Sequence, residues 1–240
     1  MRRIYLEQAE STNTYLKDLC RAGVEHGTVV YTWNQLSGYG RRGRYWHSEA
    51  DKNIAMSIVL KLLPTDINLP MSIVAGVAVH WVLLKAVSAV SIKWPNDIMI
   101  DSRKLCGISC EKINGANGQF FVVGAGINVN NGEFPAELAD TATSLYLHTG
   151  TEWDMQPILD DIIKKILFFY ELCEQGDFAN VLERFKQYCQ NIGRQVSIIH
   201  DNQITYGEAV DIDDDGGIYV RNLQGKLEKF NSGEVSLRNY

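Results

Sequence analysis

The sequence predicts an α/β protein, with a mixed β-sheet flanked by helices in its main part and a small β-unit at its C-terminal end. Short apolar runs bounded by Gly, Pro, Asn and Asp, which are typical of strands, recur between residues 28 and 129. Residues 155–174 repeat apolar side chains at steps of three and four, which indicates an amphipathic helix. From Gln195 onward, short β-like runs alternate with polar turns.

The first half of the chain begins with a short helix. Ser11 and Thr12 are favourable N-cap residues, and Gly23 is a natural helix end. A segment rich in Gly and Arg then separates two apolar runs, which predicts a loop between strands, where functional residues often lie. The expected elements are a helix over 14–21, a strand over 28–33, the loop over 35–48 and a strand over 53–60.

The stretch near residues 70–90 is the most apolar part of the chain. It is about as long as a membrane span, but it contains His80 and Lys85, and a central lysine costs roughly 2.5–3.5 kcal/mol in a bilayer. Pro70 suits the first turn of a helix, so we expect a buried helix here. The elements expected next are strands over 92–94, 98–100, 105–112 and 120–129, helices over 155–174 and 178–190, and β-runs over 196–199, 206–211, 218–222 and 229–230.

Composition narrows the class of protein. The 240 residues are 45% hydrophobic and 22% charged, which argues against disorder, and the length fits one large domain or a main domain with a small appendage. The change to short β-like runs from Gln195 favours the second organisation, with a main catalytic domain over 1–190 and a small β-barrel over 191–240. The formal net charge of -6 argues against nonspecific binding of nucleic acid. An odd number of scattered cysteines and the lack of an export signal predict reduced thiols, a cytoplasmic location and no membrane partner.

The segment 38–46, Gly-Tyr-Gly-Arg-Arg-Gly-Arg-Tyr-Trp, is the most informative part of the sequence. Its glycines let the backbone turn and approach a ligand, and its arginines offer forked donors that suit phosphate or carboxylate oxygens. The segment therefore predicts a loop that binds an anion. The alternatives are a solvated basic loop or a stretch that contacts RNA.

A second polar cluster is Lys93-Trp94-Pro95-Asn96-Asp97, which Arg103 and Lys104 follow closely. Pro95 restrains the turn, and the polar side chains after it gather where two strands meet. A plain hairpin with solvent-facing lysines is the alternative. A third cluster, residues 124–130, lacks the last glycine of a dinucleotide-binding fingerprint. Its small residues are instead expected to leave room for a ligand or for a packed neighbouring side chain.

These clusters, together with Ser11-Thr12-Asn13, resemble the catalytic region of biotin protein ligases. Four motifs occur in the order and spacing of that family: Ser-Thr-Asn, then Gln35 before Gly-x-Gly-Arg-x-Gly-Arg-x-Trp, then Lys-Trp-Pro-Asn-Asp with Lys-Leu-x-Gly-Ile, then Gly-x-Gly-Ile-Asn. The resemblance covers nearly the whole chain and implies the fold shared with class II aminoacyl-tRNA synthetases, with an SH3-like C-terminal β-barrel.

The resemblance also implies a reaction. Family members join biotin to AMP using ATP and Mg²⁺, and then pass biotin to a lysine of a biotin carboxyl carrier protein. It implies catalytic roles for Arg41 and Lys104, and biotin contacts from Ser11, Thr12, Asn13, Gln35, Gly38, Tyr39, Gly40, Arg41, Trp46, Lys104 and Gly107. ATP and phosphate contacts are expected from Arg41, Arg42, Arg44, Lys93, Asn96, Asp97 and Asn128, with Asp97 also near Mg²⁺. The alternative for Ser11 and Thr12 is plain N-capping, in which one hydroxyl caps while the other binds.

The chain departs from the family pattern in two places. Tyr39 stands where many members have Arg. The Ser-Thr-Asn motif begins at Ser11, so we expect no winged-helix DNA-binding domain and no DNA partner. The sequence does not decide between a monomer and a homodimer. The competing functions are a lipoate ligase or octanoyl or lipoyl transferase of the same fold, a noncatalytic biotin-binding protein, and an RNA-binding Gly/Arg protein.

Overall fold

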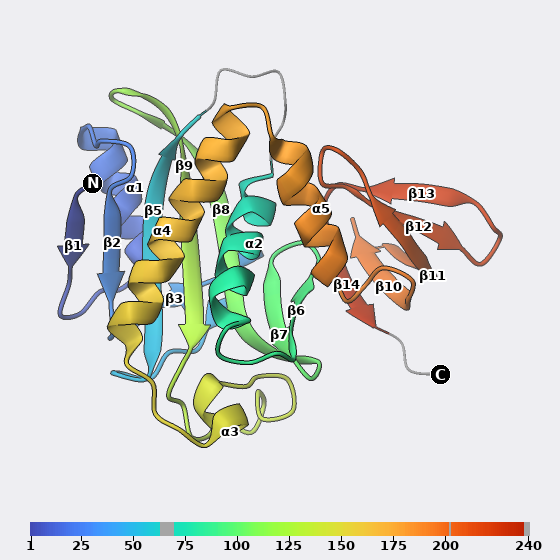
Figure 1. The fold of residues 1–240 in the computed structure, drawn as a ribbon, viewed down its shortest axis with the longest axis horizontal. Coiled ribbons are helices and arrows are strands. Elements are labelled where there is room, and N and C mark those ends of the chain that lie inside the picture. The colour runs from blue at the N-terminus through green and yellow to red at the C-terminus, as the bar shows by residue number, and fades with distance from the viewer. Residues whose placement is uncertain (63–69, 202, 238–240) are drawn as a thin grey trace.

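A seven-stranded mixed sheet forms the centre of the computed structural model, which describes residues 1–62, 70–201 and 203–237 (Figure 1). Its strands run in the order β1-β2-β5-β9-β8-β7-β6. The long central strands pair antiparallel, whereas β1 is parallel to β2. The strands are β1 (Arg3–Tyr5), β2 (Val29–Thr32), β5 (Asn53–Lys61), β6 (Val90–Lys93), β7 (Asp97–Ile100), β8 (Arg103–Gly115) and β9 (Gly118–Asn128).

Helices cover both faces of this sheet. Helix α1 (Thr12–Ala22) packs on one face against a small apolar cluster that includes Leu16, Val59 and Phe120. The larger core lies on the other face, under α2 (Met71–Leu83), α4 (Met155–Glu174) and α5 (Phe178–Tyr188), as Figure 1 shows. Because it is covered on both sides, β5 buries every residue except Lys61.

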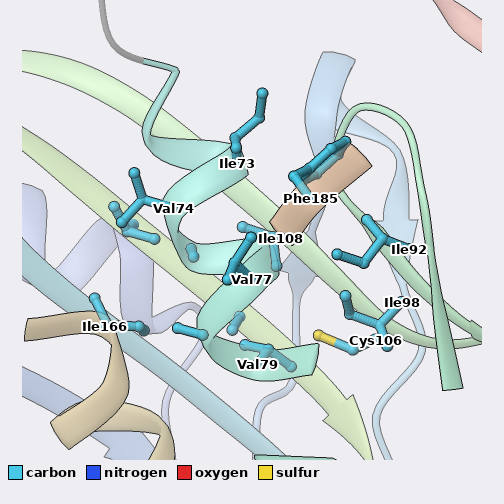
Figure 2. Close-up of a cluster of buried hydrophobic side chains, with 14 of the residues drawn as sticks. Ile73, Val74, Val77, Val79, Ile92, Ile98, Cys106, Ile108, Ile166 and Phe185 are labelled. Carbon is cyan, nitrogen blue, oxygen red and sulfur yellow. The ribbon is translucent and has the colours of Figure 1, made fainter. Parts of the chain in front are cut away.

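Helix α2 is the central element of the larger core. Ile73, Val74 and Val77 lie among side chains from the sheet and from α4, including Ile108 and Ile166 (Figure 2). The helix ends at Leu83, earlier than the expected range of 70–90. The apolar signal continues beyond it because Val87 and Val90 are also buried, in the turn after the helix and in strand β6.

The C-terminal unit is a five-stranded antiparallel sheet in the order β13-β12-β11-β10-β14. The β-character expected here is therefore present, but among the described residues no ladder joins β13 to β14, so the expected barrel is an open sheet by its pairing. Trp94 connects it to the main unit, because its Nε1 donates to the carbonyl of Gly216 at 2.9 Å. The strands are β10 (Gln195–His200), β11 (Gln203–Ile212), β12 (Ile218–Asn222), β13 (Leu227–Phe230) and β14 (Glu234–Leu237).

Several short elements add to the expected ones. They are β1, α3 (Leu145–Thr149), β14, and a small hairpin of β3 (Gly38–Tyr39) and β4 (Tyr45–Trp46) within the expected loop. Between β3 and β4 lies one turn of 3-10 helix, η1 (Arg41–Gly43). Within the described residues, no helix combines the length and apolarity that a membrane span requires.

Candidate functional site

One cavity of about 470 Å³ collects the polar clusters of the sequence. Its wall comes from the start of α1, from residues within 35–47, 93–109 and 124–142, and from residues 233–236 of the C-terminal unit. The predicted site residues in this wall are Ser11, Thr12, Asn13, Gln35, Tyr39, Gly40, Arg41, Arg44, Trp46, Lys93, Asn96, Asp97, Lys104, Gly107 and Asn128. Two predicted residues are not among them: Gly38 lies beside the wall, and the side chain of Arg42 lies outside the described residues.

The start of α1 brings three polar side chains to one end of the cavity. The hydroxyl oxygen of Ser11 caps the helix by accepting from the backbone N–H of Thr14 at 3.4 Å. The hydroxyl of Thr12 instead lies 2.8 Å from that of Ser57 on β5. Both residues thus belong to the cavity wall, and capping occupies only one of the two hydroxyls.

Gln35 completes this polar end. Its Oε1 accepts from the backbone N–H of Thr12 at 3.0 Å. Its Nε2 packs over Gly38, where a Cβ atom would lie only 2.5 Å from that nitrogen. Gly38 therefore makes room for the Gln35 amide.

Glycine is required at several positions of β8 and β9 because a larger residue would collide with a neighbouring side chain. Gly107 and Gly126 are paired across the two strands, and the indole of Trp46 lies over both of them. A Cβ on Gly126 would lie 2.5 Å from Nε1 of Trp46, and a Cβ on Gly124 would collide with the carboxamide of Asn13. The small residues of segment 124–130 thus admit packed neighbours, which is one of the two readings expected from the sequence.

Cationic groups line the other end of the cavity. Arg41 on η1 donates from Nη1 to Oδ1 of Asn96 at 3.2 Å, and Asn96 is held by a 2.5 Å bond from its Nδ2 to the carbonyl of Ile108. Nζ of Lys104 lies 2.7 Å from Oδ1 of Asp97 and 5.5 Å from the ring centre of Trp46. The second cluster is therefore part of the site and not a solvent-facing hairpin.

Lys93 and Arg44 extend this positive end toward the C-terminal unit. Arg44 forms an ion pair with Glu234 on β14. Burial lowers the pKa of Lys93, with Lys104 and Arg44 acting in the same direction, whereas Asp97 and Glu234 oppose the shift. A bound anion here would stabilise the charged form of Lys93, which is costly to bury without a partner of opposite charge.

The side chain of Asn128 holds a neighbouring segment in place, a role that its motif does not indicate. Its Nδ2 donates to the carbonyl of Thr143 at 3.0 Å, and its Oδ1 accepts from Asn53 at 2.8 Å. The segment that contains Thr143 also pairs with the backbone of Lys104, whose N–H donates to the carbonyl of Thr141 at 2.7 Å. Asn128 thus fixes segment 131–143, of which Phe134, Leu138, Thr141 and Ala142 line the cavity.

Several residues in or beside the cavity wall were not predicted from the sequence. Ser57 is fully buried in β5, and Ser109 on β8 accepts from Nδ2 of Asn13 at 2.7 Å. A single serine inside the apolar run 54–60 is itself a signal, because buried hydroxyls need partners. Glu234 gave no local signal, since only the fold brings β14 to the cavity.

Metal ligands are sparse at the site. Within the described ranges, no group of three or more His, Cys, Asp or Glu side chains is placed to hold a metal ion. The carboxylate of Asp97 is engaged by Lys104. The donor set therefore suits an ion that arrives with its own oxygen ligands, such as phosphates.

The chain is similar to known proteins in both sequence and fold. Residues 5–128 match the model of the biotin/lipoate A/B protein ligase family, and residues 192–238 match that of the biotin protein ligase C terminal domain. The chain is 30% identical over 239 residues to the bifunctional ligase/repressor BirA of Bacillus spizizenii, covering 98% of this chain and 73% of that protein.

Two further proteins are similar over most of their length. The biotin--[acetyl-CoA-carboxylase] ligase of Mycobacterium tuberculosis is 28% identical over 239 residues, which cover 95% of this chain and 86% of that protein. The biotin protein ligase from Aquifex aeolicus, solved in complex with biotin and ATP, has a TM-score of 0.87 and 29% identity, covering 100% of this chain and 99% of that one.

Proposed function

The chain belongs to the biotin/lipoate A/B protein ligase family, and we propose that it converts biotin and ATP to biotinyl-5'-AMP and then transfers the biotinyl group to a carrier protein. It is an ATP-dependent biotin protein ligase, whose acceptor is a lysine of a biotin carboxyl carrier domain. The observation that carries this function is one cavity with a neutral polar end at α1 and a cationic end at Arg41 and Lys104.

The two ends match the two parts of biotin. The ureido ring has N–H and C=O groups for the polar end formed by Ser11, Thr12 and Gln35, and Trp46 covers the apolar body between the ends. The carboxylate tail then reaches the cationic end. A dithiolane ring or a plain acyl chain would leave the polar end without partners, which disfavours lipoate or octanoate as the substrate.

In the first step, a carboxylate oxygen of biotin attacks the α-phosphorus of ATP, and pyrophosphate leaves. The carboxylate is already ionised near pH 7, so the step requires no general base. It does require two anions to meet in line, and we assign that task to Arg41 and Lys104. Asn96 and Asp97 hold these two cations in place.

Mg²⁺ enters this proposal as part of the nucleotide substrate. Phosphate oxygens and water would supply most of its ligands, with Asp97 of the cavity wall as the candidate carboxylate ligand. Arg44 and Lys93 would bind the phosphate oxygens, while segment 131–143 would lie over the base. Asn128 would hold that segment in place in addition to its expected contact with ATP.

In the second step, the neutral amine of the acceptor lysine attacks the carbonyl carbon of the adenylate, and AMP leaves. The η1 hairpin and segment 131–143 would keep water from this reactive anhydride until the acceptor arrives. We further propose a domain boundary near residue 190, a cytoplasmic location and a homodimer. Analytical ultracentrifugation tests the last of these.

Gly126→Ala is expected to raise the KM for biotin by about ten- to a hundredfold, with a smaller effect on the KM for ATP. The new Cβ would force the Trp46 indole off the strand, and overpacking of this kind typically costs ~1–3 kcal/mol. Biotin-dependent pyrophosphate release measures both constants. Gly76→Ala on α2, outside the cavity, is the matched control, since a Cβ there meets only the ring of Phe185, at 3.5 Å. An unchanged KM in Gly126→Ala would contradict the assignment of Trp46.

Transfer to protein is tested with a carrier domain and ATP. We expect mass spectrometry to show one biotinyl group on a single carrier lysine. A carrier in which that lysine is replaced by Arg serves as the control and should stay unlabelled. A protein that binds biotin but labels no carrier would be the noncatalytic alternative.

A further inference from the structure

We propose that Ser57 is a positioning residue for substrate choice, because it fixes the hydroxyl of Thr12 as a hydrogen-bond acceptor toward the ring of biotin. The inference rests on the proposed function and deepens it. Ser57 does not line the cavity, and none of the four motifs includes it.

Ser57 lies at the centre of β5 with no solvent exposure. Its hydroxyl oxygen is 2.5 Å from Oδ1 of Asn13 and 2.8 Å from Oγ1 of Thr12. The residues on either side along the strand, from 54 to 60, are otherwise apolar. A buried hydroxyl in this position is retained for its hydrogen bonds, since an apolar residue would pack equally well.

The direction of these bonds follows from counting protons. Nδ2 of Asn13 donates to Ser109, which turns Oδ1 of Asn13 toward Ser57. A carboxamide oxygen can only accept, so the hydroxyl of Ser57 donates toward Oδ1 of Asn13 and, in a shared bond, toward Oγ1 of Thr12. Because Ser57 donates to Thr12, the proton of the Thr12 hydroxyl turns to another acceptor. That acceptor is Oε1 of Gln35, which lies 3.4 Å from Oγ1 of Thr12 and accepts from the Thr12 N–H with its other lone pair.

The consequence is a defined polarity at the end of the cavity. With its proton directed to Gln35 and one lone pair engaged by Ser57, Thr12 can offer a ligand only the remaining lone pair of its oxygen. Gln35 has the complementary constraint, because its Oε1 is engaged by Thr12 and its Nε2 remains as the donor. An acceptor beside a donor matches the N–H and C=O of a cyclic urea, whereas a dithiolane ring has neither group.

A double-mutant cycle tests this assignment. The KM for biotin and the kcat of pyrophosphate release are measured for the unaltered protein, Ser57→Ala, Thr12→Val and the double variant. We expect Ser57→Ala to raise the KM about tenfold while kcat stays within about twofold. In the Thr12→Val background the same change should alter the KM by less than about twofold, because the hydroxyl that Ser57 orients is gone.

Val59→Ala is the structural control. Val59 is two residues along the same strand, on the same face and fully buried, but it makes no hydrogen bond through its side chain. Its replacement should lower thermal stability and leave the KM for biotin nearly unchanged. If Ser57→Ala does not fold, Ser57→Cys keeps the volume with a weak donor and should give an intermediate KM.

Lipoate provides a second readout. As a competitive inhibitor it should keep its Ki in Ser57→Ala, because its ring makes no use of the Thr12 oxygen. A Ki for lipoate that rises in parallel with the KM for biotin, or a Ser57→Ala effect that is equally large in the Thr12→Val background, would overturn the inference alone. If the unaltered protein releases no pyrophosphate with biotin, the proposed function fails and the inference with it.

Discussion

Lys104→Ala is expected to slow biotin-dependent pyrophosphate release by about a thousandfold, with the fold intact. Removing one group that stabilises developing charge typically costs ~10²–10³ in rate. Here the loss also leaves the carboxylate of Asp97 without the ammonium 2.7 Å away, so an uncompensated negative charge would face two anionic substrates. Circular dichroism would confirm the fold, and single-turnover pyrophosphate release would give the rate.

Two companion variants sharpen this test. Lys112→Ala removes a lysine from the same strand, outside the cavity, and should keep nearly full activity. Asp97→Asn in the Lys104→Ala background removes the stranded charge and should recover part of the lost rate. Near-normal pyrophosphate release by Lys104→Ala would contradict the catalytic role of this lysine.

Arg41→Ala is expected to release biotinyl-5'-AMP about a hundredfold faster while still forming it. Arg41 contributes a cation at the cavity and connects η1 to Asn96 across it through a 3.2 Å hydrogen bond. Losing both weakens the hold on the adenylate by an expected ~2.7 kcal/mol, which corresponds to that factor in rate. Dissociation of labelled adenylate from a preformed complex, chased with unlabelled adenylate, measures it.

Arg103→Ala is the matched control for this variant. Arg103 is on β8 next to Lys104 but is not among the residues that line the cavity. It should leave the dissociation rate within about twofold of the unaltered protein. Equal dissociation rates for Arg41→Ala and the unaltered protein would show that Arg41 does not retain the adenylate.

Strong local patterns made much of the fold predictable. The three-and-four periodicity of α4 gave both of its ends, Met155 and Glu174, because an amphipathic helix with a capping Asp154 has clear limits. Strand β12 was likewise bounded correctly by its turns. The end of α2 was missed because helix, turn and strand are all buried there, and apolarity alone does not separate them.

Short elements could not be predicted, for a related reason. Strand β1 has three residues and forms only by parallel pairing with β2, so its stability comes from a partner distant in sequence. The open pairing of the C-terminal sheet is also a long-range property. Neither leaves a periodic signal in the chain.

The site residues also divide into those that lie in sequence motifs and those that depend on contacts between distant strands. Residues within motifs, such as Arg41 and Lys104, could be predicted because the charged residue types are read directly from the sequence; both line the cavity, and their catalytic roles stay a proposal. Ser57 and Glu234 act through contacts between distant strands, so no motif contains them. Asn128 lines the cavity, as the motif predicts, and its expected contact with ATP stays a prediction; only the three-dimensional contacts reveal that its amide also bonds to Thr143 and Asn53.

Mass analysis of the adenylate tests the central claim most directly. The unaltered protein is incubated with ATP and Mg²⁺, and with either biotin or lipoate, and the products are identified by mass. We expect biotinyl-5'-AMP and pyrophosphate with biotin, and little or no lipoyl-AMP with lipoate, since the end of the cavity formed by Thr12 and Gln35 requires N–H and C=O partners. Adenylation of lipoate without adenylation of biotin would contradict the function assigned to this protein.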